Sequence, residues 1–252
     1  MDRKFTLSCC STVDLPYSYM ESRDIPVLFY TYVVDGREYD DDMGRDPEAL
    51  PRFYAFLKEG KLPQTSQINV AAYTEFFEKL LDKGGDVLHI AFTSGQSGSV
   101  HNAFLAAEEL KDRYPGQRLV VIDSLCSSSG YGLLVDYAAD MRDEGKTLDE
   151  VAQWVLDNRN KVHHQFFSSD MTQFRRTGRV SGAAAAVATV LNICPSCGWT
   201  TRARSRRTAR CGARKKPWRP RWTPWSSAPR AAGTMTASAS SATASARRTP
   251  GW

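Results

Sequence analysis

A hydroxyl-rich loop between a predicted strand and a predicted helix carries the residues of this sequence most suited to chemistry. Residues 93–99 read Thr-Ser-Gly-Gln-Ser-Gly-Ser. The apolar run Val87–Phe92 before them is typical of a strand buried on both faces, and a helical apolar period begins at Val100. Such an order aims backbone N–H groups, hydroxyls and the positive end of a helix dipole at one place, so we expect an anion to bind there. The alternative is a purely structural loop, because Ser and Gly also cap helices.

The same loop lacks the signatures of the common catalytic loops. Residues 95–99 miss the final glycine of the G-x-S-x-G nucleophile elbow, and no G-x-x-x-x-G-K-[ST] phosphate loop occurs. A hydrolase that uses Ser94 or Ser97 would need a general base, and His101, the nearest in sequence, is more simply a helix-surface residue. We therefore expect no enzyme.

The elements around the loop alternate between strand and helix. Apolar runs predict strands, which are Phe5–Cys9, Ile25–Val34, Val87–Phe92, Leu119–Ile122 and Gln165–Ser168. Helical spacing and end signals predict helices, which are Pro47 to Gly60, a stripe over Tyr73–Leu81, Val100–Tyr114, Gly130–Arg142 and Leu148–Asn158. This alternation predicts an α/β fold with a parallel sheet, right-handed crossovers and flanking helices.

Composition limits the class of protein further. The 252 residues contain no apolar stretch of membrane-spanning length and no signal-peptide pattern, which favours a cytoplasmic protein without a membrane span. The six cysteines then indicate reduced thiols. No metal site is expected, because His163 and His164 have no partner at ligand spacing. The acidic run Asp40–Asp42 is most simply a solvated loop, with a cation site as the alternative.

Several of these segments together resemble the DegV family of bacterial fatty-acid-binding proteins. The segments of this sequence that match the family motifs, in order, are Ser11–Pro16 for D-S-T-A-D-L-P, Thr65–Gln67 for T-S-Q-P, Thr93–Ser99 for S-S-x-L-S-G-T, Val121–Ser124 for V-x-D-S and Gly178–Ser181 for G-R-I-S. Some positions depart from the family pattern. Cys9-Cys10 replaces Thr-Asp, Gln96 replaces Leu, Ser99 replaces Thr, and the later H-x-G-P-G segment is missing.

The resemblance implies a carrier that buries a long-chain fatty acid between two α/β domains and presents it to a fatty-acid kinase. Such a carrier does no chemistry itself and needs no cofactor. Thr65, Ser94 and Ser97 would hold the carboxylate, because the family uses hydroxyls of the corresponding loops. Neutral donors suit this role, since hydrogen bonds to a charged group are strong. Arg179 and Arg176 have two readings, a solvated basic turn or a docking patch for the kinase.

The last part of the chain differs in composition from the rest. Residues 196–252 hold 13 of the 33 Lys and Arg, none of the 28 Asp and Glu, and five of the six Trp. The net charge of +5 therefore combines a basic tail with an acidic remainder at −8. At face value the tail is a disordered nucleic-acid-binding segment, which gives the alternative function of the protein.

The genetic code offers a better account of this tail. Shifting each codon one base earlier lets the segment after Pro195 encode Ile-Leu-Arg-Met-Asp-Asp, and lets residues 211–217 encode Val-Arg-Gly-Lys-Lys-Lys-Ala. The second resembles the K-V-R-G-x-K-K-A segment of DegV proteins. We therefore expect a reading-frame shift near residue 195. We also expect that nucleic acid is not a partner of the protein. The expected organisation is a first α/β domain over residues 1–162, the start of a truncated second α/β domain over 163–195, and a low-complexity basic tail over 196–252 without a compact fold.

Overall fold

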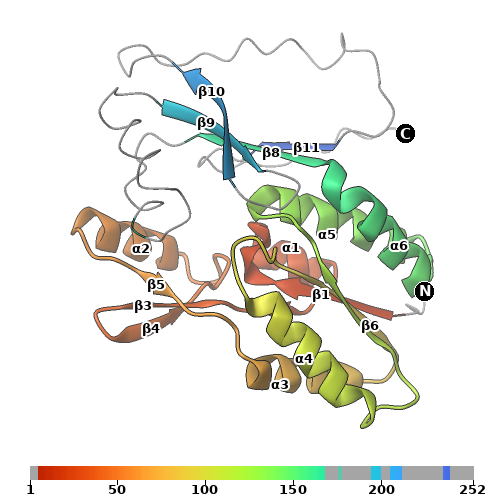
Figure 1. Ribbon diagram of the computed structural model, residues 1–252. Helices are drawn as coiled ribbons and strands as arrows, with labels where there is room; N and C mark the ends of the chain where they lie inside the picture. The colour runs from red at the N-terminus through yellow and green to blue at the C-terminus, as the bar shows by residue number, and fades with distance from the viewer. Residues whose placement is uncertain (1–4, 168–175, 177–193, 200–204, 212–234, 239–252) are drawn as a thin grey trace, which may run out of the picture.

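The computed structural model of the protein describes residues 5–167, 176, 194–199, 205–211 and 235–238. Its centre is a parallel sheet of four strands in the order β2-β1-β6-β7 (Figure 1). The strands of this sheet are β1 (Phe5–Cys10), β2 (Val27–Leu28), β6 (Asp86–Ala91) and β7 (Leu119–Asp123). The predicted parallel sheet is thereby confirmed.

Helices cover both faces of this sheet. One face packs against α1 (Tyr17–Ser22), α5 (Ser128–Asp143) and α6 (Leu148–Asn158), and the other against α3 (Val70–Leu81) and α4 (Ser99–Lys111) (Figure 1). The strand side chains alternate accordingly. Leu88 and Ile90 join the first cluster and Val87 joins the second, so β6 is buried on both faces.

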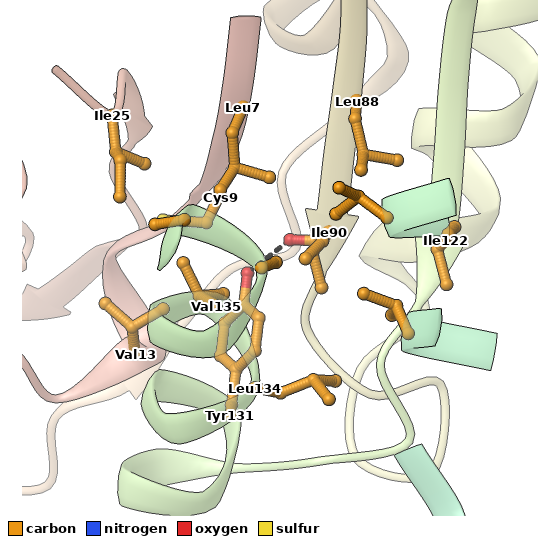
Figure 2. Packing of buried hydrophobic residues seen from close by; sticks show 14 of the residues in the cluster. Leu7, Cys9, Val13, Ile25, Leu88, Ile90, Ile122, Tyr131, Leu134 and Val135 are labelled. Atoms are coloured by element: carbon orange, nitrogen blue, oxygen red, sulfur yellow. Dashed lines mark hydrogen bonds between the residues drawn. The ribbon is translucent and has the colours of Figure 1, made fainter. Parts of the chain in front are cut away.

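The core under α5 contains a polar side chain that joins two strands. Figure 2 shows Leu7, Cys9, Leu88 and Ile90 of the sheet facing Tyr131 of α5. The Tyr131 hydroxyl donates to the carbonyl of Ile90 at 2.5 Å and accepts the N–H of Cys10 at 3.0 Å. It therefore connects the carboxyl ends of β1 and β6.

A small antiparallel sheet interrupts the alternation. It consists of β3 (Thr31–Val34), β4 (Arg37–Asp40) and β5 (Gln64–Thr65) in the order β4-β3-β5, with α2 (Ala49–Lys58) packed on it through rings such as Phe53 against Tyr32. The β3–β4 turn contains Asp35 and Gly36, both with positive φ. An Asp-Gly pair favours this turn geometry.

The prediction of one continuous strand over Ile25–Val34 is wrong. The segment forms β2 and β3, which lie in different sheets. The break falls at Tyr30, whose N–H donates to Ser11 Oγ at 3.1 Å and whose carbonyl accepts the N–H of Asp41 at 2.8 Å. The Asp41 bond continues the register of β3 with β4, whereas the Tyr30 N–H is taken by a side chain of the loop after β1, so Tyr30 is not bonded into the parallel sheet.

The acidic run Asp40–Asp42 at the end of β4 is not simply solvated. Asp41 accepts the hydroxyl hydrogen of Ser11 at 2.8 Å, and burial raises the pKa of its carboxyl. Asp42 instead accepts the backbone N–H groups of Gly44 and Asp46. Asp41 and Asp42 therefore stabilise the loop that they belong to. The described residues contain no group of three His, Cys, Asp or Glu side chains placed to hold a metal.

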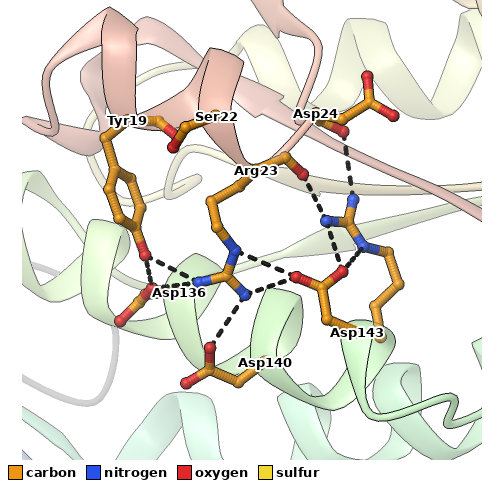
Figure 3. Close-up of polar contacts among 8 residues, drawn as sticks. Tyr19, Ser22, Arg23, Asp24, Asp136, Asp140 and Asp143 are labelled. Carbon is orange, nitrogen blue, oxygen red and sulfur yellow. Dashed lines mark hydrogen bonds and ion pairs between the residues drawn. The ribbon is translucent and has the colours of Figure 1, made fainter.

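Ionic contacts fix α1 to α5. Arg23 at the end of α1 pairs with Asp140 and Asp143, both at 2.9 Å, and with Asp136 at 3.4 Å (Figure 3). The buried Arg142 donates to the carbonyls of Arg23 and Asp24. Because α1 follows the loop after β1, this cluster also holds that loop in place.

The third sheet has the strand order β10-β9-β8-β11. Its strands are β8 (Val162–Phe167), β9 (Cys194–Trp199), β10 (Ser205–Cys211) and β11 (Met235–Ser238). β10 and β11 lie within the basic tail, and the absence of a compact fold in this tail stays a prediction. A ladder of backbone hydrogen bonds does not require aliphatic side chains, which explains strands in a segment that lacks them.

Candidate functional site

The candidate site lies at the edge of the parallel sheet where the loops after two neighbouring strands lead to opposite faces. The chain leaves β1 toward the face covered by α1, and it leaves β6 toward the opposite face covered by α4 (Figure 1). Since β1 and β6 are adjacent and parallel, their following loops, residues 11–16 and 92–98, diverge at one edge of the sheet. Open α/β sheets bind ligands at such a switch point.

The loop after β6 is built around Thr93, which is buried. Its carbonyl accepts the N–H groups of Gln96 and Ser97 at 3.3 Å, and its Oγ1 accepts the N–H of Gly95 at 3.1 Å. The N–H of Ser94 donates to Asp123 Oδ1 at 3.1 Å. The backbone donors of residues 94–97 are therefore used within the protein. Side-chain hydroxyls, rather than these N–H groups, are what this loop offers to an anion.

Thr65 does not lie on a loop of the parallel sheet. It is an exposed residue of β5, where it pairs with Tyr32 of β3, and its side chain has no hydrogen-bond partner among the described residues. The next residue, Ser66, contacts Thr31 through their hydroxyls at 3.1 Å. Thr65 thus keeps its own hydroxyl open.

The chain just after Thr65 docks on the loop after β6. The N–H of Ile68 donates to Ser99 Oγ at 3.0 Å, and Asn102 Nδ2 donates to the carbonyl of Ile68 at 2.8 Å. The Gln67 side chain covers Gly98 so closely that a Cβ there would lie 2.8 Å from Gln67 Oε1. The Thr65 segment and the Ser94 loop are therefore direct neighbours.

Ser94 and Ser97 differ in how free their hydroxyls are. Ser94 is exposed, and its Oγ has no hydrogen-bond partner among the described residues. Ser97 Oγ lies 2.9 Å from Ser99 Oγ and accepts the N–H of Ser99 at 3.3 Å. The structure thus places Ser97 in contact with the helix start and leaves Ser94 open.

The site contains two residues whose roles the sequence did not reveal. Asp123 at the end of β7 accepts both the N–H of Ser94 and that of Leu125, at 3.1 and 3.0 Å. Its signals in the sequence were its place directly after a buried strand and its position in the V-x-D-S match of residues 121–124. Tyr30 was expected inside a strand, yet it lies beneath the loop, with its ring edge-on to Phe92 at 6.0 Å between centroids.

Other candidate residues fall outside this group. His101 is exposed on α4, and within the described part of the chain no hydrogen bond joins the Ser94 or Ser97 hydroxyl to a histidine or carboxylate. Arg176 is exposed, whereas Arg179 lies outside the described residues.

The cysteines of the main sheet and its loops are not activated. Cys9, Cys10 and Cys126 are free and buried, and burial raises the pKa of the Cys10 thiol to about 11. These thiols are packed core groups rather than nucleophiles. No helix among the described residues is long and apolar enough to cross a membrane.

The fold and this arrangement define a three-layer α/β protein with a hydroxyl-lined candidate binding site at its switch point. A sequence model described as "Uncharacterised protein, DegV family" matches residues 9–202. A DegV domain-containing protein of Clostridium perfringens (strain 13 / Type A) is 38% identical over 194 residues, which cover 77% of this chain and 66% of that protein. The chain belongs to the DegV family. It spans slightly less than two thirds of the length of this relative.

Further relatives and solved structures agree with this assignment. The DegV domain-containing protein YteA of Lactococcus lactis subsp. lactis (strain IL1403) is 31% identical over 84% of this chain and 73% of its own length. A DegV lipid binding protein from Thermotoga maritima has a similar structure, with a TM-score of 0.71, 26% identity and coverage of 83% of this chain and 72% of that chain. A fatty-acid-binding DegV family protein from Thermus thermophilus also has a similar structure, with a TM-score of 0.72, 27% identity and coverage of 83% of this chain and 72% of that chain.

The family match ends inside the basic tail. It extends to residue 202, shortly after the proposed shift of reading frame near residue 195. The abrupt change of composition falls in the same stretch. The frame shift and the domain limits at residues 162 and 195 stay predictions.

Proposed function

We propose that the protein binds a long-chain fatty acid and holds its carboxylate with the hydroxyls of Thr65, Ser94 and Ser97. The observation that carries this proposal is the docking of the Thr65 segment on the Ser94 loop through the Ile68 to Ser99 hydrogen bond. It makes neighbours of two segments whose open hydroxyls suit an anion. The solved DegV structures that bind lipid or fatty acid share this fold at 26 and 27% identity, which supports the same ligand class.

Hydroxyl donors favour an acid over a neutral lipid. A carboxylate accepts several hydrogen bonds, and bonds to a charged group stabilise by about 1.5–3 kcal/mol each. No cation is required at the site for this. The Ser94 N–H donates to Asp123, which holds the backbone of this residue in place before the ligand arrives.

Replacing Ser94 by alanine should weaken fatty-acid binding without unfolding the protein. Ser94 is exposed and its hydroxyl has no described partner, so its loss leaves no buried group unsatisfied. We expect the Kd for stearate to rise roughly tenfold or more, as measured by titration calorimetry. Ser22→Ala is the matched control. Ser22 is an exposed serine at the end of α1, and its described hydrogen bond is to the carbonyl of Tyr19. Equal Kd values for wild type and Ser94→Ala would remove Ser94 from the site.

We further propose that the protein is a carrier rather than an enzyme, and that it presents the acid to a fatty-acid kinase in the cytoplasm. The basic turn with Arg176 and Arg179 would contact that kinase. Complementary charge mainly sets association rates and specificity, which suits a transient contact.

Charge reversal in this turn tests the kinase contact. Arg176→Glu should slow phosphorylation of bound stearate by a fatty-acid kinase while stearate affinity stays unchanged, since Arg176 is exposed. Arg37→Glu, an exposed change on β4, is the control. The phosphorylation rate is followed with labelled ATP. A parallel loss of stearate affinity would show instead that the residue belongs to the binding site.

A further inference from the structure

A buried phenol without a partner lies behind the candidate site. Tyr30 is only 7% exposed, and its Oη has no hydrogen-bond partner among the described residues. Burial, and then Cys10, raise the pKa of this phenol, whereas the Ser99 and Ser97 hydroxyls oppose the rise. Both serine hydroxyls therefore lie close to the phenol oxygen, and neither forms a hydrogen bond with it in this structure. A buried hydroxyl that bonds nothing is destabilising, which makes this position unusual.

The Tyr30 ring is packed in the interior, and its hydroxyl oxygen is buried. Both backbone groups of Tyr30 are bonded, to Ser11 Oγ and to Asp41 N–H. The ring packs edge-on against Phe92. The phenol oxygen is thus buried close to Ser97 and Ser99, where α4 begins.

The serine hydroxyls in front of Tyr30 form a short chain whose direction is open. Ser99 is fully buried, and its Oγ accepts the N–H of Ile68. Ser97 Oγ accepts the N–H of Ser99, and the two hydroxyls share one hydrogen bond of 2.9 Å in which either can donate. Each hydroxyl has one hydrogen to donate and two lone pairs to accept with. The direction of the shared bond therefore decides whether the Ser97 hydrogen is available outside.

A bound carboxylate selects one direction. It takes the Ser97 hydrogen, so Ser99 must donate to Ser97, and both lone pairs of Ser97 are then filled. Ser99 Oγ keeps one free lone pair beside the bond from Ile68, and the Tyr30 hydroxyl is the buried donor next to it. In the opposite direction Ser97 donates inward and offers no hydrogen to a ligand.

We propose that Tyr30 and Ser99 form a hydroxyl relay behind Ser97 that turns its hydroxyl hydrogen toward an anionic ligand. Both are positioning residues, because they act through Ser97 and do not touch the ligand. The relay rests on the proposed fatty-acid function and deepens it, since it favours the acid over its neutral esters. Successive hydrogen bonds polarise one another, so a donor at the buried end strengthens the bond at the exposed end.

Tyr30→Phe tests the relay cleanly. It removes one oxygen that bonds nothing in the described structure, so the midpoint of chemical unfolding should not fall. We expect the Kd for stearate to rise on the order of fivefold while binding of methyl stearate is unchanged. Tyr32→Phe is the matched control, because Tyr32 is also buried, lies two residues further along and stacks on Tyr39.

Ser99 provides a second test with a built-in rescue. Ser99→Ala should lower stearate affinity more than methyl stearate affinity, and Ser99→Thr, which keeps the hydroxyl, should restore the preference for the acid. If Ser99→Ala does not fold, because the Ile68 N–H loses its acceptor, the Tyr30→Phe measurement decides alone.

The outcomes separate the relay from the proposed function. Stearate affinity that is unchanged in Tyr30→Phe but reduced in Ser94→Ala would overturn the relay and leave the function standing. Equal losses for stearate and methyl stearate in Tyr30→Phe would overturn it as well, since the effect would be one of shape. A wild-type chain that binds no stearate would overturn both.

Discussion

Tyr131→Phe should lower the free energy of unfolding by about 2–5 kcal/mol, because leaving two buried backbone groups unsatisfied costs about 1–3 kcal/mol each. Tyr131 is fully buried. Its hydroxyl accepts the N–H of Cys10 and donates to the carbonyl of Ile90 (Figure 2). Phenylalanine fills the same space and leaves both backbone groups without this partner. Denaturant unfolding followed by circular dichroism measures the loss.

The substitution also tests how the site is supported. Cys10 and Ile90 stand at the carboxyl ends of β1 and β6, where the two loops of the switch point begin. Tyr137→Phe is the control, since Tyr137 lies on the same helix α5, is 42% exposed and has no described hydrogen bond. A loss in Tyr131→Phe as small as in the control would mean that water or a shifted backbone satisfies both groups.

The main sheet could be predicted from local sequence because its strands are buried on both faces. Short apolar runs identified β1, β6 and β7, and helical spacing identified α3 to α6, with limits close to those found. The strand over Ile25–Val34 failed because β2 pairs with β1 and β3 pairs with β4 and β5, while the Tyr30 N–H between them bonds Ser11. These contacts come from distant parts of the chain, and no local pattern contains them.

The candidate site was predictable only in part for a similar reason. The hydroxyl-rich loop after β6 was visible as residue types in the right order. The sequence did not show how the donors of this loop are used, because the Ser94 N–H donates to Asp123 of the next strand. The burial of Tyr30 close to Ser97 and Ser99 depends on the break between β2 and β3, where the chain passes from one sheet to another. Such pairings appear only when the elements are assembled.

A buried histidine should make the stability of the protein fall in mild acid. His89 of β6 is fully buried, with Nδ1 3.0 Å from Ser8 Oγ and Nε2 3.6 Å from Cys10 Sγ. The rings of Tyr73 and Phe77 pack edge-on against it. Burial lowers the pKa of His89 from 6.5 to about 3, and no carboxylate is bonded to it. The imidazole is therefore neutral in the folded protein.

The sign of the effect follows from proton binding. The unfolded chain takes up a proton on His89 near pH 6.5, and the folded chain does so only near pH 3. Stability from this group is thus complete above pH 6.5 and falls as the pH drops toward 3. Between pH 7 and pH 5 the loss is about 2 kcal/mol. Burial also lowers the pKa of His164, to about 4, so that residue adds a loss of the same direction.

Comparing wild type with His89→Gln isolates this contribution. Glutamine keeps polar atoms for Ser8 and Cys10 but takes up no proton, so the stability of the variant should fall about 2 kcal/mol less between pH 7 and pH 5. Carboxylates and His164 are common to both chains and cancel in the difference. His101→Gln, an exposed change on α4, is the control. If the variant does not fold, the His89 ring resonance in the wild-type NMR spectrum should show no titration between pH 7 and pH 5. Parallel stability curves for wild type and His89→Gln, or a ring that titrates in that range, would show that a proton reaches His89 in the folded protein.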